Sequence, residues 1–183
     1  MEVCTQKAWD ICEKYKLPRM IYVSNMDVDN ASFRQVVEDM TQMFGKKMAP
    51  FHLPIRENEK FVGYVNVITE TGNRWQGKDV VECEVPEYNK ANLQICRETL
   101  MEAVAETSEE MMERYFGGET FSAAEIRAAL RTNVCDGSIV PMTMGSNILC
   151  QGMYTLLDDI IKYFPSPENR TVAGINMKTN EIY

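Results

Sequence analysis

The sequence has few of the residues from which metal sites and nucleophilic sites are built. Among its 183 residues there is a single histidine, His52, and none of the six cysteines forms a Cys-x-x-Cys pair. A zinc site, or a cysteine nucleophile with a histidine base, needs such partners, so neither is expected. His52 stands between Pro50 and Pro54 and is interpreted as structural, and the cysteines are interpreted as reduced, packed thiols.

Long apolar runs and an excess of positive charge are also missing. No run approaches the roughly 20 residues of a membrane-spanning helix, and the first residues lack the basic and apolar regions of a secretory signal. The formal net charge is -8, whereas proteins grip nucleic-acid phosphates with clustered Lys and Arg. We therefore expect a soluble, cytoplasmic protein that makes no direct sequence-specific contact with nucleic acid and no contact with a membrane.

Two stretches far apart in the chain share one pattern, an apolar run that leads into a small polar turn. Met20–Val23 precedes Ser24–Asp27, and Ile139–Met144 precedes Gly145–Asn147. Apolar runs of this kind are typical of strands buried in a parallel sheet, and such sheets bind ligands at the carboxyl ends of their strands. If the two strands lie side by side, their turns form one site.

Helical patterns accompany both strands. Residues 3–16 place apolar side chains at helical spacing, and a second helix is predicted to begin at Asn30 as its N-cap and to end at Gly45. The last helix has the clearest amphipathic pattern of the chain, with the stripe Met153, Leu156, Leu157, Ile160, Ile161 and Phe164.

The sequence pattern changes in the part of the chain that lies between the two apolar strands and their helices. Phe61–Ile68 and Val80–Val85 are strand candidates, and three helical patterns follow them. The first, about Asn89–Glu106, has one apolar and one acidic stripe, and capping boxes at Thr107 with Glu110 and at Ser122 with Glu125 begin the other two.

The fold class indicated is α/β, with a parallel sheet and helices, interrupted by an inserted α+β subdomain. Residues 1–50 and 138–170 are assigned to the α/β body, 51–137 to the inserted subdomain, and 171–183 to a linker toward a following domain.

Several separated blocks of the sequence resemble bacterial translation elongation factor G. They are Lys14–Asp27, Phe44–Ile55, Glu98–Thr107, Ile139–Ser146 and Lys162–Pro167. The blocks occur in the order of that family, and the resemblance covers about residues 5 to 168. It is to the second half of the family's GTP-binding domain, of the P-loop GTPase type, together with the subdomain inserted in it.

The resemblance implies a ribosome-associated GTPase of the translocation step, which uses GTP or GDP with Mg²⁺. The family's Asn-Lys-x-Asp loop falls on Ser24–Asp27, and its Ser-Ala turn falls on Ser146 and Asn147. We expect the Asp27 carboxylate to accept from N1–H and from the exocyclic amine of guanine, and backbone N–H groups of the turn to donate to O6. Ser24 and Asn25 replace the family's Asn and Lys, so the loop lacks the amide that ties it at the first position and the lysine stem that lies against the base at the second.

Parts of the family's phosphate site are missing from the sequence. There is no Gly-x-x-x-x-Gly-Lys-Ser/Thr loop and no Asp-x-x-Gly, so nothing cradles the phosphates or supplies the magnesium hydroxyl. We expect a fragment that neither hydrolyses GTP alone nor holds a bound nucleotide. The alternative is a non-catalytic, ribosome-binding paralogue that has lost guanine recognition. A third interpretation, an unrelated small-molecule enzyme, is not supported, because the sequence shows no set of catalytic residues that could act together.

Two surfaces are candidates for binding partners. In the family the inserted subdomain faces the ribosomal stalk. The resemblance therefore makes Leu93, Glu98 and Glu102 of the matching helix candidate partner-binding residues. The alternative is that the apolar stripe of this helix packs on the small sheet and that its glutamates are solvated. The strand Arg19–Val23 is expected to have a bare edge, through which the chain self-associates.

Overall fold

The computed structural model describes residues 3–45, 48–77, 79–166 and 168. Its elements, in chain order, are α1 (Val3–Tyr15), β1 (Ile21–Val23), α2 (Phe33–Phe44), β2 (Met48–Pro50), β3 (His52–Glu57), β4 (Lys60–Asn66), β5 (Thr71–Gln76), β6 (Asp79–Cys83), α3 (Glu87–Ala105), α4 (Glu109–Phe116), α5 (Ala123–Asp136), β7 (Val140–Met144) and α6 (Met153–Tyr163). None of the helices within the described ranges is long and apolar enough to cross a membrane.

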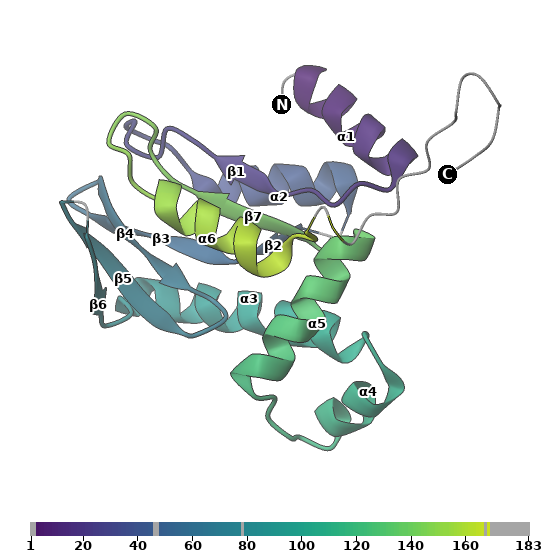
Figure 1. Cartoon of the computed structure of the whole chain (residues 1–183). Helices are drawn as coiled ribbons and strands as arrows, with labels where there is room; N and C mark the ends of the chain where they lie inside the picture. The colour runs from purple at the N-terminus through teal and green to yellow at the C-terminus, as the bar shows by residue number, and fades with distance from the viewer. Residues whose placement is uncertain (1–2, 46–47, 78, 167, 169–183) are drawn as a thin grey trace, which may run out of the picture.

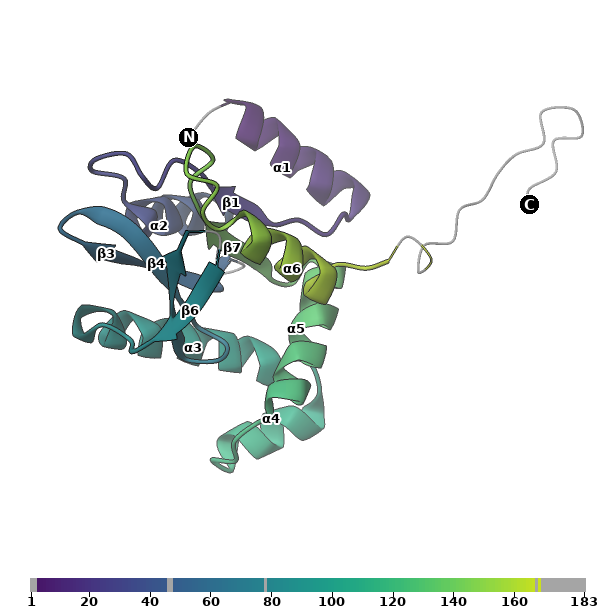
Figure 2. The same cartoon turned by 60° about the vertical axis from the view of Figure 1, so that its left-hand side comes forward.

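The first and last parts of the chain build one parallel sheet in the order β1-β7-β2. Helices α2 and α6 lie on opposite faces of this sheet (Figure 1, Figure 2). The expected α/β body is therefore confirmed, with β2 as an additional strand that is short and ends in Pro50. β1 is half-buried instead of buried on both faces, because it lies at an edge of the sheet.

Strands β3 to β6 form an antiparallel sheet in chain order. The two strands predicted for this region are present as β4 and β6, and the inserted antiparallel sheet is confirmed. β3 and β5 escaped prediction because their sequences carry weak strand signals: β3 contains Pro54, and β5 contains Gly72 among polar residues. Pro54 is tolerated because β3 is an edge strand, where a missing N–H need not cost a ladder bond.

One buried cluster joins the two sheets, and Phe51 is at its centre. The N–H of Phe51 donates to the carbonyl of Met142 in β7, and its own carbonyl accepts from the N–H of Val67, both at 3.0 Å. The change from one sheet to the other coincides with the predicted division near residues 50 and 138. The domain boundaries themselves stay a prediction, and the segment 171–183 lies outside the described residues.

The helix starts were predicted with mixed success. The capping box expected for α5 is present. However, α2 begins after Ser32, whose Oγ accepts from a backbone N–H of the first turn, whereas Asn30 lies before the helix with a positive φ of 64°. Likewise, Ser108 caps α4, while the Thr107 hydroxyl donates back to a carbonyl at the end of α3.

Helix α6 has the predicted amphipathic stripe, but much of that stripe is exposed. Its buried residues are Asp159 and Tyr163, whereas Leu157, Ile160 and Ile161 of the apolar stripe are exposed. The stripe therefore faces outward along much of the helix, and a carboxylate faces inward.

Candidate functional site

The two polar turns singled out in the sequence lie next to each other. β1 and β7 pair in parallel with Val23 opposite Met144, so both turns begin at the same edge of the sheet. The N–H of Gly145 donates to the carbonyl of Val23 at 3.0 Å, and the N–H of Met26 donates to the carbonyl of Gly145 at 3.1 Å. The prediction that both strands belong to one parallel sheet with neighbouring carboxyl ends is thereby confirmed.

This close approach requires glycine at position 145. A Cβ there would lie 2.1 Å from the Tyr22 hydroxyl oxygen and 2.3 Å from the carbonyl oxygen of Gln151. The Tyr22 hydroxyl donates to the sulfur of Met153 at 3.4 Å. Burial, together with the nearby Cys150, raises the pKa of Tyr22, so its hydroxyl stays protonated as a donor.

Asp27 carries an unsatisfied buried oxygen at this edge. The preceding Met26 is fully buried and anchors the turn in the core. Asp27 is half-buried, and its Oδ1 atom is shielded from solvent without a hydrogen-bond partner among the described residues. A buried acceptor without a donor costs about 1–3 kcal/mol, and more when it is charged. A ligand whose N–H donors reached this oxygen, after the atoms that cover it had moved aside, would remove that cost.

Ser24 and Asn25 lie on the surface of the same turn. Asn25 has a φ of 59°, a left-handed conformation that asparagine tolerates better than most residues. A hollow of about 360 Å³ lies beside both residues and extends to Ser32 and Val36 of the α2 region. Asp27 does not line this hollow, so a ligand inside it would touch Ser24 and Asn25 but not the carboxylate.

The second turn is arranged differently from the expectation. Ser146 is fully buried; its N–H donates to the carbonyl of Gln151 at 2.9 Å, and its Oγ accepts from the N–H of Leu149 at 3.1 Å. These bonds close the loop before α6 and occupy the N–H that was expected to hold a base oxygen. Asn147 is exposed, which leaves its N–H as the candidate donor.

Arg56 of the inserted subdomain also supports the site, although no sequence pattern pointed to it. Its Nη2 donates to the carbonyls of Met26 and Ala31, both at 2.9 Å, and its Nη1 donates to the carbonyl of Glu59 at 2.7 Å. One guanidinium thus ties the turn that contains Asp27 to strand β3. An isolated arginine in a strand has no recognisable pattern, so this role was not foreseeable.

His52 has the structural role that the sequence indicated. It is 3% exposed, and its Nδ1 lies 3.6 Å from Oδ2 of Asp159, which is 4% exposed. Burial, reinforced by Lys162, lowers the pKa of His52 to about 3. Burial raises the pKa of Asp159 to about 7, with Lys162 opposing and Asp158 adding to the rise. The ring of Tyr64 packs against His52 with centroids 4.8 Å apart.

The cysteines form no disulfide. All six are free thiols, and burial raises the pKa of Cys96 to about 11. Cys4 and Cys150 are exposed, so the prediction of packed thiols is wrong for these two. Within the described ranges, His, Cys, Asp and Glu side chains nowhere form a cluster of three that could hold a metal ion.

A phosphate-binding loop would need a glycine-rich turn that opens a helix. The nearest sequence match, Gly72 to Lys78 with the spacing Gly-x-x-x-x-Gly-Lys, is followed by Asp79 instead of Ser or Thr. Its first part is strand β5, and the next element is strand β6. This hairpin offers no helix N-terminus to a phosphate.

The candidate partner-binding residues on α3 divide into two groups. Leu93 is 8% exposed and packs in the core, so it is out of reach of a partner. Glu98 and Glu102 are exposed. A hollow of about 320 Å³ lies beside Glu102 and is also lined by Thr99, Glu106 and Ile139.

Comparison with known proteins relates the whole chain to part of a larger protein. No protein-family model matches it. The chain is 34% identical to elongation factor G of Neorickettsia sennetsu over 187 aligned residues, which include all of this chain and 27% of that protein. This chain is related to part of elongation factor G.

A solved structure supports the same relation at the level of the fold. The crystal structure of a protein from Thermus thermophilus superposes with a TM-score of 0.85 at 30% sequence identity, over 95% of this chain and 26% of that one. The chain therefore spans about a quarter of the length of the relatives that it matches.

Proposed function

We propose that this chain supplies the base-recognising side of a guanine-nucleotide site, and the inserted subdomain, of a cytoplasmic translational GTPase similar to elongation factor G. The observation that carries the proposal is the unpartnered Oδ1 of Asp27 beside the turn after β7. GTP would bring its own reactive phosphates, bound with Mg²⁺ in the intact protein. The residues of this chain hold the base only, and hydrolysis requires phosphate-binding groups from elsewhere.

The chemistry of Asp27 explains how guanine is distinguished from adenine. Guanine presents two donors on one edge, N1–H and the exocyclic amine, to which both oxygens of a carboxylate can bind. Adenine has an acceptor at N1, which would face the carboxylate with repulsion. Sites that hydrogen-bond a ligand group in this way reject an analogue without it by up to about 10⁴–10⁵-fold. The N–H of Asn147 is the proposed donor to O6.

A nuclear magnetic resonance titration tests this proposal directly. Guanosine monophosphate at millimolar concentration should shift the amide signals of residues 24–27 and 145–147, and adenosine monophosphate should leave them in place. Because the phosphate-binding half is missing, we expect GDP to bind with negligible affinity. Micromolar GDP binding in calorimetry, or equal shifts with both nucleotides, would contradict the proposal.

A second candidate function is a non-catalytic, ribosome-binding paralogue without guanine recognition. Two observations favour it: Ser24 and Asn25 stand where the family has Asn and Lys, and the N–H of Ser146 is already bonded to Gln151. The protein that contains this chain would then bind ribosomes equally well with and without GTP. GTP-dependent ribosome binding would exclude this candidate.

The proposed ribosomal contact of the inserted subdomain is the stalk protein of the large subunit, at the exposed acidic face of α3. Reversing the charge of Glu98 and Glu102 to lysine should weaken binding of labelled stalk protein, because both residues are exposed on α3 and Glu102 lines the hollow. Glu59→Lys, an exposed residue on the β3–β4 hairpin, is the matched control. Unchanged affinity for the double reversal would remove the α3 face from consideration.

The free edge of β1 is a proposed site of self-association. Within the described part of the chain β1 pairs only with β7, so its other edge presents backbone groups without a strand partner there. We expect dimers or larger species at high concentration. A monomer in light scattering at all concentrations would count against this.

A further inference from the structure

Strand β6 is the outermost strand of the four-stranded sheet. Among the residues that the structure describes, it pairs with β5 alone, so every second N–H and C=O along β6 points away from the sheet. Val80 and Val81 are 43% and 42% exposed and project to the two faces of the strand. Both the backbone and the apolar side chains of this edge are thus open to an added strand.

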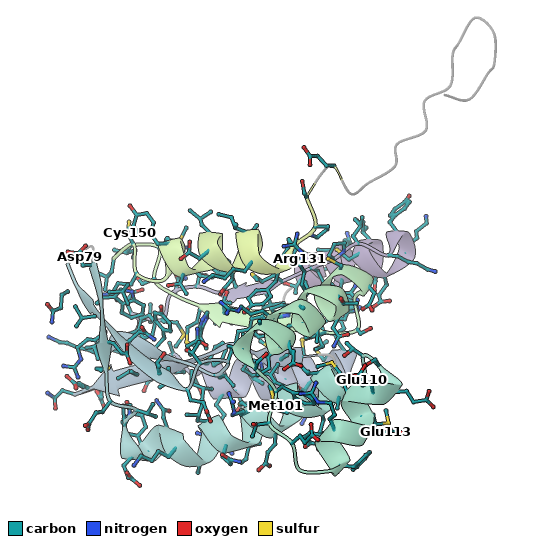
Figure 3. All side chains as sticks on the ribbon, turned by 60° about the horizontal axis from the view of Figure 1, so that its bottom comes forward. Asp79, Met101, Glu110, Glu113, Arg131 and Cys150 are labelled. Carbon is teal, nitrogen blue, oxygen red and sulfur yellow. The ribbon has the colours of Figure 1, made fainter. Side chains whose placement is uncertain are left out.

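An apolar hollow lies at the beginning of β6. It has a volume of about 210 Å³ and lies between the β5–β6 hairpin, with Trp75 and Val80, and the start of α6, where Leu149 precedes the helix and Tyr154 belongs to its first turn. Figure 3 shows Asp79 and Cys150 at the same end of the molecule. The hollow has room for one large apolar side chain.

An acidic hollow lies at the end of the same strand. It has a volume of about 780 Å³ and is lined by Glu70, Glu82, Glu84 and Lys90, among others. Glu70 is paired with Arg97, and Lys90 with Glu87. Glu82 and Glu84 form no ion pair with any residue that the structure describes. The uncompensated charge in this hollow is therefore negative.

The two hollows have a fixed spacing along the strand. Val80 pairs with Trp75 and lines the apolar hollow, whereas Glu84, at the acidic hollow, is four residues further on, with Glu82 between them. Side chains four positions apart on a strand project to the same face and are separated by about 13 Å. A strand added to β6 would reach both hollows with two side chains on one of its faces, four positions apart.

We propose that the outer edge of β6 binds a basic, extended segment of another protein by strand addition. One large apolar side chain of that segment fills the hollow at Trp75, and a Lys or Arg four positions away, on the same face of the segment, enters the hollow at Glu82 and Glu84. Backbone hydrogen bonds supply affinity in this mode, and the two side chains supply specificity. The negative charge of the strand end favours a basic partner over an acidic one.

The test uses the full chain and the amidated, acetylated peptide Thr-Phe-Thr-Val-Thr-Lys-Thr, with its reversed sequence for the opposite strand direction. At least one of the two should bind saturably and shift the amide signals of β6 and the indole signal of Trp75. The indole of Trp9, stacked on Phe44 in another part of the molecule, is an internal control that should not move. A peptide with Phe and Lys three positions apart, on opposite faces, should bind at least about tenfold more weakly.

Charge exchange separates specific binding from loss of fold. Glu82→Lys with Glu84→Lys should lower the affinity at least about tenfold, and a peptide with Glu in place of Lys should restore it. Glu110→Lys with Glu113→Lys, at the opposite end of the molecule (Figure 3), should change nothing. The proposal is overturned if neither peptide saturates below about 1 mM, if the shifts map to α3 and α4, or if the exchanged pair shows no recovery.

Discussion

Replacing Asp159 by asparagine should stabilise the protein at neutral and alkaline pH, although it removes a charged residue from the interior. Asp159 is buried between α6 and β3, and its Oδ2 has no hydrogen-bond partner among the described residues. His52, at 3.6 Å, is too far for a hydrogen bond and stays neutral, because burial lowers its pKa to about 3. Asparagine has a similar shape and never ionises.

The magnitude follows from the raised pKa of Asp159. Its ordinary value is 3.8, and burial raises it to about 7. Between these values the unfolded chain has released the proton while the folded protein keeps it, so stability falls as pH rises. At about 1.4 kcal/mol per pKa unit, the loss reaches about 4 kcal/mol at pH 7 and above. Asp159→Asn should recover much of this amount at pH 8 and little of it at pH 4.

The pH dependence of wild-type stability would not by itself reveal this effect. His52 acts in the opposite direction: its pKa falls from 6.5 to about 3, so its contribution to stability grows as pH rises through that window. Over the pH range common to both groups, the stability lost through Asp159 is nearly equal to the stability gained through His52. The difference between variant and wild type isolates Asp159, because His52 is present in both.

Urea denaturation between pH 4 and pH 8 measures that difference. Asp29→Asn, at an exposed position in the loop before α2, is the control for the removal of one carboxylate charge. The reasoning is refuted if the stability of Asp159→Asn relative to wild type does not rise with pH, since Asp159 would then be ionised in the folded protein without cost.

Three further substitutions test other parts of the structure. Arg56→Met should leave the carbonyl of Met26 without its donor, which costs about 1–3 kcal/mol, and should speed hydrogen exchange in residues 24–31; unchanged exchange would show that the guanidinium does not hold the turn. Gly145→Ala should cost about 1–3 kcal/mol in thermal unfolding, because its Cβ would overlap the Tyr22 hydroxyl; wild-type stability would mean that the bend relaxes freely. Ser108→Ala should cost about 1 kcal/mol through loss of the α4 cap, and a melting temperature equal to wild type would contradict that role.

The sequence contained most of the information about the parallel sheet. An apolar strand that ends in a polar turn, found twice, was sufficient to place Ser24–Asp27 beside Gly145–Asn147. Local periodicity also located the helices, although it misplaced the caps of α2 and α4 by one or two residues, where several polar side chains compete for the same N–H groups. β3 and β5 were missed because their stability comes from pairing with β4 and not from their own residues.

The parts of the site that were missed depend on contacts between distant segments. Arg56 reaches the Asp27 turn across 30 residues of sequence, and the N–H of Ser146 is taken by a backbone carbonyl, which no side-chain pattern records. The outward-facing apolar stripe of α6 has the same periodicity as an inward-facing one, so its orientation depends on where Asp159 and Tyr163 fit.

The central claim, that Asp27 reads the edge of a guanine base, is tested most directly by Asp27→Asn with two nucleotides. Xanthine has a carbonyl where guanine has its exocyclic amine, so an asparagine amide can donate to xanthine as the carboxylate accepts from guanine. Asp29→Asn, in the same turn region and exposed, is the control. We predict that Asp27→Asn loses the amide shifts caused by guanosine monophosphate and gains them with xanthosine monophosphate, while wild type and control prefer guanosine. Unchanged preference in the Asp27 variant would contradict the claim.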